Sequence, residues 1–145
     1  MYDKRMDAAW WSLRVAFFLG TFLAGLDKFF HFMVNWDMYL DPIALRILGP
    51  YSHTFMLIVG VVEMIVGLMV ITAWPRLGGY LAALWLLCIT ISLVISGVMT
   101  GQYWDIALRD VGLCLGAFAF GRLSAARMAA RVDVEVPRES ERLAA

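Results

Sequence analysis

Four long apolar stretches follow one another along the chain and constrain its fold more than any other feature. They cover residues 12–32, 53–74, 77–99 and 104–122, and each reaches roughly the 20 residues that a helix needs to cross a bilayer. Hydrophobic residues make up 62% of the 145-residue chain, which is more than a soluble domain of this size hides in one core. The sequence therefore predicts an all-α membrane protein, with a four-helix transmembrane bundle in a domain of residues 1–122.

Basic residues mark one side of the predicted bundle. They precede the first stretch, lie between the second and third, and follow the fourth: Lys4, Arg5, Arg14, Arg76, Arg122, Arg127, Arg131, Arg138 and Arg142. Cytoplasmic loops carry an excess of lysine and arginine. We expect a multi-pass protein of the plasma (inner) membrane, with its N and C termini cytoplasmic.

Two segments outside the stretches have their own patterns. In the first loop, Asp41 and Pro42 suit the start of a helix and Gly49-Pro50 suits its end. This pattern predicts a short interfacial helix over residues 42–48. Residues 123–145 form a basic segment that we expect to be a partly disordered cytoplasmic tail.

Glu63 is the most unusual residue for a membrane helix, because it lies about 16 Å from the outer end of the second stretch at 1.5 Å per residue. An ionisable group at that depth must face the bundle, find a partner or be protonated. Gly60 and Gly67 share its helix face and allow another helix to approach. Glu63 is either a structural acid that fixes helix register or an acid that handles a ligand or a proton; both interpretations stay open.

A second group of charges lies in the outer half of the bundle. Arg109 and Asp110 are adjacent in the fourth stretch, so their side chains leave the helix about 100° apart and each is expected to find a partner on another helix. Asp27 and Lys28 lie at a similar depth on the first stretch. We expect an interhelical network of these four residues, with Glu63 as a more distant member, in either a structural or a functional role.

The two histidines, His31 and His53, lie at the outer ends of the first two stretches. Two histidines exclude a multi-histidine metal site, and we predict no metal. A haem held by both is the weaker alternative, because interfacial histidines more often bind solvent or backbone. Asp27, four residues before His31, is in position to orient its ring, and that pair suits a quinone head group.

The remaining candidate features predict packing. Gly112 and Gly116 form a seam of small residues on the fourth stretch. Cys88 and Cys114 have no metal-ligand or redox spacing and are interpreted as small apolar residues. Because 12 basic residues balance 12 acidic ones, nothing favours nucleic acid as a partner.

Several short motifs resemble those of the DoxX family of small four-helix membrane proteins. They are Ala24-Gly25-Leu26-Asp27-Lys28-Phe29, Leu48-Gly49-Pro50, residues 62–68 around Glu63, Leu108-Arg109-Asp110-Val111-Gly112 and Gly121-Arg122-Leu123-Ser124. The resemblance covers roughly residues 12–126. It implies functional positions at Lys28, Glu63 and the pair Arg109-Asp110, and an association with quinol oxidase or thiosulfate:quinone oxidoreductase complexes.

Three functions are compatible with these features. The first is an accessory subunit of a quinone-linked redox complex, as the resemblance implies, in which the chain is not catalytic alone but forms part of a quinone-dependent oxidoreductase. The second is a non-enzymatic membrane scaffold, and the third is a small oligomeric transporter. The partners expected are lipid and either other membrane subunits or further copies of the chain. Quinone is the one cofactor that the resemblance favours, and no cofactor follows from the residues themselves.

Overall fold

A computed structural model describes residues 6–143, and the side chains of residues 6–130. The long helices are α1 (Met6–Asp27), α3 (Ser52–Ile71), α4 (Pro75–Thr100) and α5 (Trp104–Leu143). Between α1 and α3 lie the 3-10 helix η1 (Trp36–Tyr39), the short helix α2 (Pro42–Leu48) and the 3-10 turn η2 (Gly49–Tyr51). The described chain contains no strand, so the prediction of an all-helical fold is confirmed.

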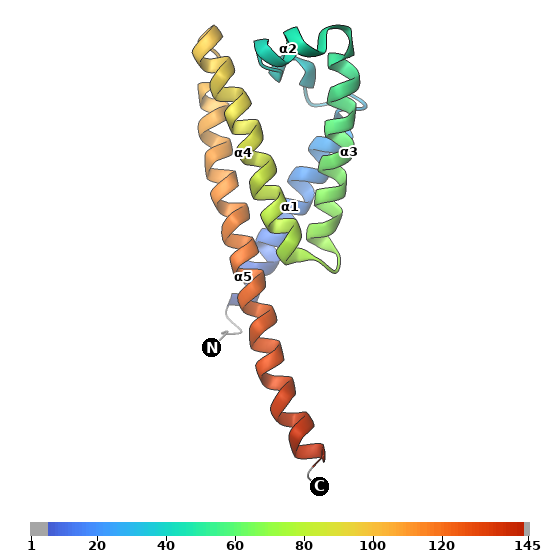
Figure 1. Cartoon of the computed structure of the whole chain (residues 1–145), viewed down its shortest axis with the longest axis vertical. Helices are drawn as coiled ribbons and strands as arrows, with labels where there is room; N and C mark the ends of the chain where they lie inside the picture. Colours follow the sequence, from blue (N-terminus) through green and yellow to red (C-terminus); the bar gives the residue numbers. More distant parts are fainter. Residues whose placement is uncertain (1–5, 144–145) are drawn as a thin grey trace.

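Three segments within the described residues are long and apolar enough to cross a membrane: Met6–Asp27, Pro42–Ile71 and Pro75–Thr100. The fourth long helix, α5, carries Asp105, Arg109 and Asp110 near its start and does not meet that criterion. It packs along α4 over much of its length (Figure 1). The structure therefore has a bundle of four long helices, and a membrane crossing by α5 stays a prediction.

The bundle consists of two helix pairs, α1 with α3 and α4 with α5, which share the most extensive contacts (Figure 1). The pairs meet in a core in which Val70, Ala82, Ala117 and Phe120 are fully buried. Small residues on α4 let α5 approach closely: a Cβ on Gly79 would lie 2.9 Å from the backbone nitrogen of Gly121. Close backbone approach through small residues is how helices associate where lipid removes the hydrophobic drive.

Large apolar side chains cover the outside of the bundle. They are exposed on every long helix, among them Leu19, Leu23, Ile58, Ile65, Leu84, Leu87, Ile91, Val98, Leu115 and Phe118. A monomeric soluble protein rarely presents a continuous apolar surface of this kind. The surface identifies lipid as the solvent around the bundle.

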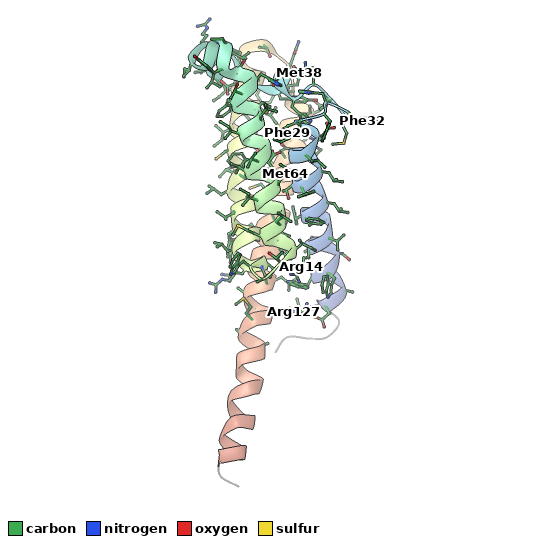
Figure 2. The ribbon with its side chains drawn as sticks, turned by 90° about the vertical axis from the view of Figure 1, so that its right-hand side faces the viewer. Arg14, Phe29, Phe32, Met38, Met64 and Arg127 are labelled. Atoms are coloured by element: carbon green, nitrogen blue, oxygen red, sulfur yellow. The ribbon has the colours of Figure 1, made fainter. Side chains whose placement is uncertain are left out.

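Helix α1 ends at Asp27, earlier than the expected end of the first stretch at residue 32. The Asp27 carboxylate accepts hydrogen bonds from the backbone N–H groups of Phe32 (2.8 Å) and Met33 (3.1 Å). These bonds turn the chain away from the helix axis. The side chain of Phe32, at the end of the bundle shown in Figure 2, is 93% exposed.

Arg14 lies at the opposite end of the bundle (Figure 2) and stabilises the end of α3. Its guanidinium donates to the carbonyl oxygens of Val70 (3.0 Å) and Ile71 (2.9 Å), and also to that of Thr72. The last carbonyls of a helix have no partner within it, and a basic side chain satisfies them well. The same end holds Arg127, whose guanidinium lies 3.1 Å from the carboxylate of Asp7 (Figure 2).

The short helix in the first loop occurs where its sequence predicts. Asp41 Oδ1 accepts from the N–H groups of Ile43 (3.0 Å) and Ala44 (2.9 Å), and Pro42 is the first residue of α2. The other carboxylate oxygen of Asp41 accepts a hydrogen bond of 2.6 Å from the Ser92 hydroxyl on α4. Asp41 therefore both begins α2 and attaches it to the second helix pair.

Helix α5 continues past the bundle to Leu143 (Figure 1). The expected division between a transmembrane domain and a tail at residues 122–123 does not coincide with a helix end. Arg127 on α5 still contacts the first turn of α1 through Asp7. A separate role for residues 123–145 stays a prediction.

Candidate functional site

A buried ion pair joins the end of α1 to the middle of α3. Lys28 directly follows the end of α1, and Glu63 lies in the middle of α3. Lys28 Nζ lies 2.6 Å from Glu63 Oε2, and the two side chains are 2% and 6% exposed. An isolated charge at membrane depth is costly, so the two groups depend on each other.

Two glycines explain why these side chains meet. A Cβ on Gly25 would lie 2.5 Å from the carbonyl oxygen of Gly60, and a Cβ on Gly60 would lie 2.7 Å from the carbonyl oxygen of Gly25. The backbones of α1 and α3 therefore touch at this crossing. Gly67, about two turns further along α3, faces Thr21 and Phe22 in the same way.

Two tryptophans enclose the ion pair. Trp85 on α4 donates its Nε1–H to Glu63 Oε1 at 3.3 Å, so both carboxylate oxygens have a partner. Lys28 Nζ lies 3.9 Å from the centre of the Trp36 ring. A cation over the face of a tryptophan ring is attracted by the ring's negative face.

An open apolar groove between α3 and α4 lies beside Trp85. Its volume is about 330 Å³, and Val62, Ile65, Met69 and Leu84 line it together with Trp85. Trp85 both lines this groove and donates its indole N–H to the Glu63 carboxylate. The groove has the character of a surface for an acyl chain or another apolar group.

Asp27 is a structural centre for the loop after α1. Besides the N–H groups of Phe32 and Met33, its carboxylate accepts a hydrogen bond of 2.7 Å from Trp36 Nε1. The prediction that this carboxylate orients the His31 ring is wrong, because its hydrogen bonds come from Phe32, Met33 and Trp36. His31 instead donates its backbone N–H to the Asp27 carbonyl oxygen at 2.7 Å.

The predicted interhelical network is wrong for the described residues. It was expected to join Asp27, Lys28, Arg109 and Asp110. Arg109 Nε lies 3.3 Å from Asp110 Oδ1, with the Arg109 side chain 66% exposed and that of Asp110 7% exposed. The long arginine stem bends back to its neighbour, which the 100° angle between adjacent side chains does not prevent. Asp110 therefore pairs within α5, whereas Lys28 pairs with Glu63 on α3.

The two predicted packing glycines of α5 differ. A Cβ on Gly116 would lie 3.2 Å from the Phe17 ring, so this glycine does face α1. Gly112 has open space at its Cβ position among the residues that the structure describes. The expected seam is therefore one glycine at Gly116, and Gly112 faces outward.

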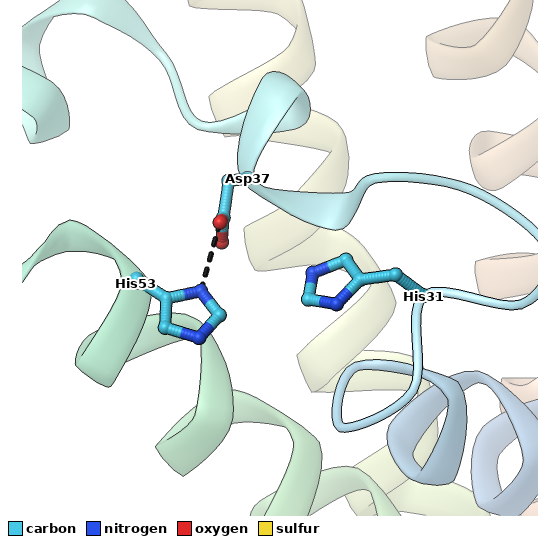
Figure 3. Close-up of side chains that lie close together, drawn as sticks. All are labelled: His31, Asp37 and His53. Atoms are coloured by element: carbon cyan, nitrogen blue, oxygen red, sulfur yellow. Dashed lines mark hydrogen bonds and ion pairs between the residues drawn. The ribbon is translucent and has the colours of Figure 1, made fainter.

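His31 and His53 come together at the α2 end of the bundle (Figure 3). Their rings are stacked, with centroids 5.7 Å apart and planes at 24°. His53 Nδ1 lies 2.8 Å from Asp37 Oδ2. Sequence analysis overlooked Asp37, because nothing in the spacing of a loop aspartate indicates that it faces a histidine 16 residues later.

A family model described as methylamine utilisation protein MauE matches residues 6–105, more than half of the chain. The chain belongs to the MauE family. The match includes Lys28, Glu63 and both histidines of this MauE-family protein, and it ends before Arg109. No curated protein and no solved structure shows significant similarity to the chain.

The assignment to the MauE family corrects the resemblance to DoxX, which rested on short motifs that many membrane helices share. No match to a DoxX model accompanies the MauE match. The quinone-linked complex was inferred from that resemblance and loses its basis with it. What the MauE match and the three apolar segments support is a multi-pass membrane protein of a family described by methylamine utilisation.

Proposed function

We propose that this chain is a membrane accessory protein of a methylamine-utilisation system, in which it supports the redox proteins of the system without being the catalyst. The MauE match over residues 6–105 is the observation that carries the proposal. The described core supports an accessory role, because its buried charges Lys28 and Glu63 are held by partners within the chain.

The proposed location is the cytoplasmic (inner) membrane, with the start of α1 and the continuation of α5 on the cytoplasmic side. Arg14 and Arg127 lie together at that end of the bundle (Figure 2). The opposite end carries α2 and the histidines (Figures 1 and 3). This distribution of arginines agrees with the positive-inside rule.

Deletion of the gene in its native host tests the function. We expect the deletion strain to grow normally with ammonium but to fail with methylamine as the nitrogen source, and to lose methylamine-dependent reduction of an artificial electron acceptor. The wild-type gene should restore both. Normal growth and normal acceptor reduction in the deletion strain contradict the proposal.

Two variants refine the test. Asp105→Asn changes an exposed residue near the start of α5 and should complement fully. Glu63→Gln removes the charge that Lys28 needs and should complement poorly. The amount of each variant in the membrane, measured by immunoblot, separates loss of the protein from loss of its action.

A scaffold role is the second candidate, and the outer face of α5 favours it. Leu108 is 74% exposed and Leu115 is 64% exposed, on either side of the open space at Gly112. Small residues flanked by large apolar ones suit contact with another membrane helix. Loss of complex assembly on native gels in Arg109→Gln and Glu63→Gln, with unchanged turnover of the redox enzyme, favours the scaffold.

A further inference from the structure

Three potential metal ligands converge at the α2 end of the bundle, outside the buried ion pair. His31 follows α1, Asp37 lies in η1, and His53 lies in the first turn of α3. One ligand atom from each can be chosen so that all three atoms lie within 4.8 Å of one another. In Figure 3 the His31 ring and the Asp37 carboxylate both lie beside the His53 ring.

The loop that brings these ligands together is held in an unusual conformation. His31 has a φ of 52°, in the left-handed region that a residue with a side chain seldom adopts. The hydrogen bond from its N–H to the Asp27 carbonyl accompanies this conformation. Strained backbone of this kind persists where the surrounding structure fixes it, and it is concentrated at functional sites.

Asp27 also fixes the approach to Asp37. Its carboxylate binds the N–H groups of Phe32 and Met33, which follow His31, and the indole of Trp36, which precedes Asp37. One buried carboxylate thus positions the segments on which two of the three ligands stand. Anchoring of this kind restricts how far His31 and Asp37 can separate.

The carboxylate of Asp37 has an acceptor without a partner. Its Oδ2 faces His53 Nδ1, whereas Oδ1 is buried and has no hydrogen-bond partner within the described part of the chain. A buried acceptor without a donor is costly, and a bound cation is one of the arrangements that satisfies it. The His53 side chain is 54% exposed, so the group stays open to water.

The sequence-based prediction of no metal counted histidines alone and did not include Asp37. We propose instead that His31, Asp37 and His53 bind one divalent transition metal ion of the class of Zn²⁺, with water completing its coordination. Imidazole and carboxylate are both zinc ligands, and three protein ligands with an open position are typical of sites that exchange water or substrate. The site is separate from the proposed role in methylamine utilisation and does not depend on it.

Small movements of the side chains are sufficient to close the site. Two ligands about 2.1 Å from a tetrahedral zinc ion lie about 3.4 Å from each other. The distance of 2.8 Å between His53 Nδ1 and Asp37 Oδ2 is already shorter than that. The ligand atom of His31 lies within 4.8 Å of the other two, so a displacement on the order of 1 Å brings it into the same range.

Zinc titration of the full chain tests the site. The protein is purified in mild detergent with a tag that contains no histidine, stripped with a chelator and titrated with ZnCl₂ against a chromophoric competitor. We expect one ion per chain in the wild type. His31→Ala, Asp37→Asn and His53→Ala should each weaken the affinity at least tenfold, whereas Asp105→Asn, at an exposed carboxylate of the same end, should bind as the wild type does.

Cobalt substitution of the wild-type chain gives a second measurement that needs no variant. Co²⁺ bound by the two imidazoles and the carboxylate should give intense visible absorption that one equivalent of Zn²⁺ abolishes. Absence of one-to-one binding by the wild type overturns the proposal, and so does equal binding by the wild type and the three ligand variants. Neither result bears on growth with methylamine, so the two proposals fail separately.

Discussion

Lys28 and Glu63 form an ion pair 2.6 Å long where the backbones of α1 and α3 touch. The ion pair depends on the helix crossing: α1 and α3 approach closely at Gly25 and Gly60, and this brings the two side chains to the same depth. The pair is therefore at once a product of the helix crossing and a lock on its register. The first two predictions test these two aspects separately.

Removal of one charge should destabilise the bundle strongly. Glu63→Gln leaves the Lys28 ammonium without its counterion, and Lys28→Met leaves the carboxylate without its own. We expect each change to lower the free energy of unfolding by about 3–5 kcal/mol, because a single buried charge keeps its desolvation penalty. Equilibrium unfolding in mixed micelles measures this.

The double variant Lys28→Met with Glu63→Gln is the control for that experiment. It removes both charges, so it should recover most of the lost stability. If the two single losses simply add in the double variant, the ion pair is not the coupling between α1 and α3.

The close approach of α1 and α3 should tolerate no added methyl group. In Gly25→Ala the new Cβ meets the Gly60 carbonyl oxygen at 2.5 Å, a backbone atom that moves only if the helices separate. We expect a loss of about 1–3 kcal/mol, as for other overpacked sites. Gly20→Ala on the same helix has open space and should cost nothing; equal behaviour of the two variants contradicts the crossing.

The attachment of α2 to α4 should weaken in acid. Burial raises the pKa of Asp41, but hydrogen bonds from the Ser92 hydroxyl and from the N–H groups of Ala44 and Ile43 outweigh burial, and the pKa lies below its ordinary value. A lowered pKa in the folded state gives stability that is complete above the unfolded-state pKa. We expect that stability to fall as the pH drops below about 4.

Two variants isolate this effect in the pH dependence of unfolding. Ser92→Ala removes one hydrogen bond and should lower the free energy of unfolding by about 1 kcal/mol at neutral pH. The variant should then lose less stability than the wild type as the pH falls. Asp41→Asn keeps a capping side chain but has no proton to gain, so the part of the acid dependence due to residue 41 should disappear. An unchanged profile in Asp41→Asn assigns the dependence to other groups.

The orientation of the bundle can be measured with single cysteines. In a Cys88→Ser, Cys114→Ala background, Arg46→Cys places a thiol on α2, and Arg76→Cys places one at the opposite end, in the first turn of α4. A membrane-impermeant maleimide should label position 46 in intact cells and position 76 only after permeabilisation. The reverse pattern contradicts cytoplasmic termini.

Sequence reasoning located the buried acid but not its partner. The depth of Glu63 and the glycines on its face follow from helix periodicity, which requires only one helix at a time. The choice of Lys28 rather than Arg109 depends on how α1 and α5 rotate against α3, which is decided by contacts such as those of Gly25 and Gly116. The spacing of residues along one helix does not determine how that helix is rotated against its neighbours.

Contacts between distant parts of the chain could not be predicted from the sequence for a similar reason. Trp36, Asp37 and Trp85 each contact a residue that sequence analysis had singled out, yet their own spacing is unremarkable. Tryptophans near a membrane boundary are expected as anchors, which concealed the role of Trp36 above Lys28. The capping of α2 by Asp41, in contrast, is local and was predicted from four residues.

The hydrogen bond of 2.8 Å from Trp10 Nε1 to Ser124 Oγ joins residues 114 positions apart. During translation Trp10 is therefore synthesised long before its acceptor, whereas Glu63 follows Lys28 after only 35 residues. During synthesis the α1–α3 half is able to mature first, and arrival of the last helix completes the assembly. A chain cut short before Ser124 would leave that indole N–H without its acceptor, so the contact forms only when the last helix is complete.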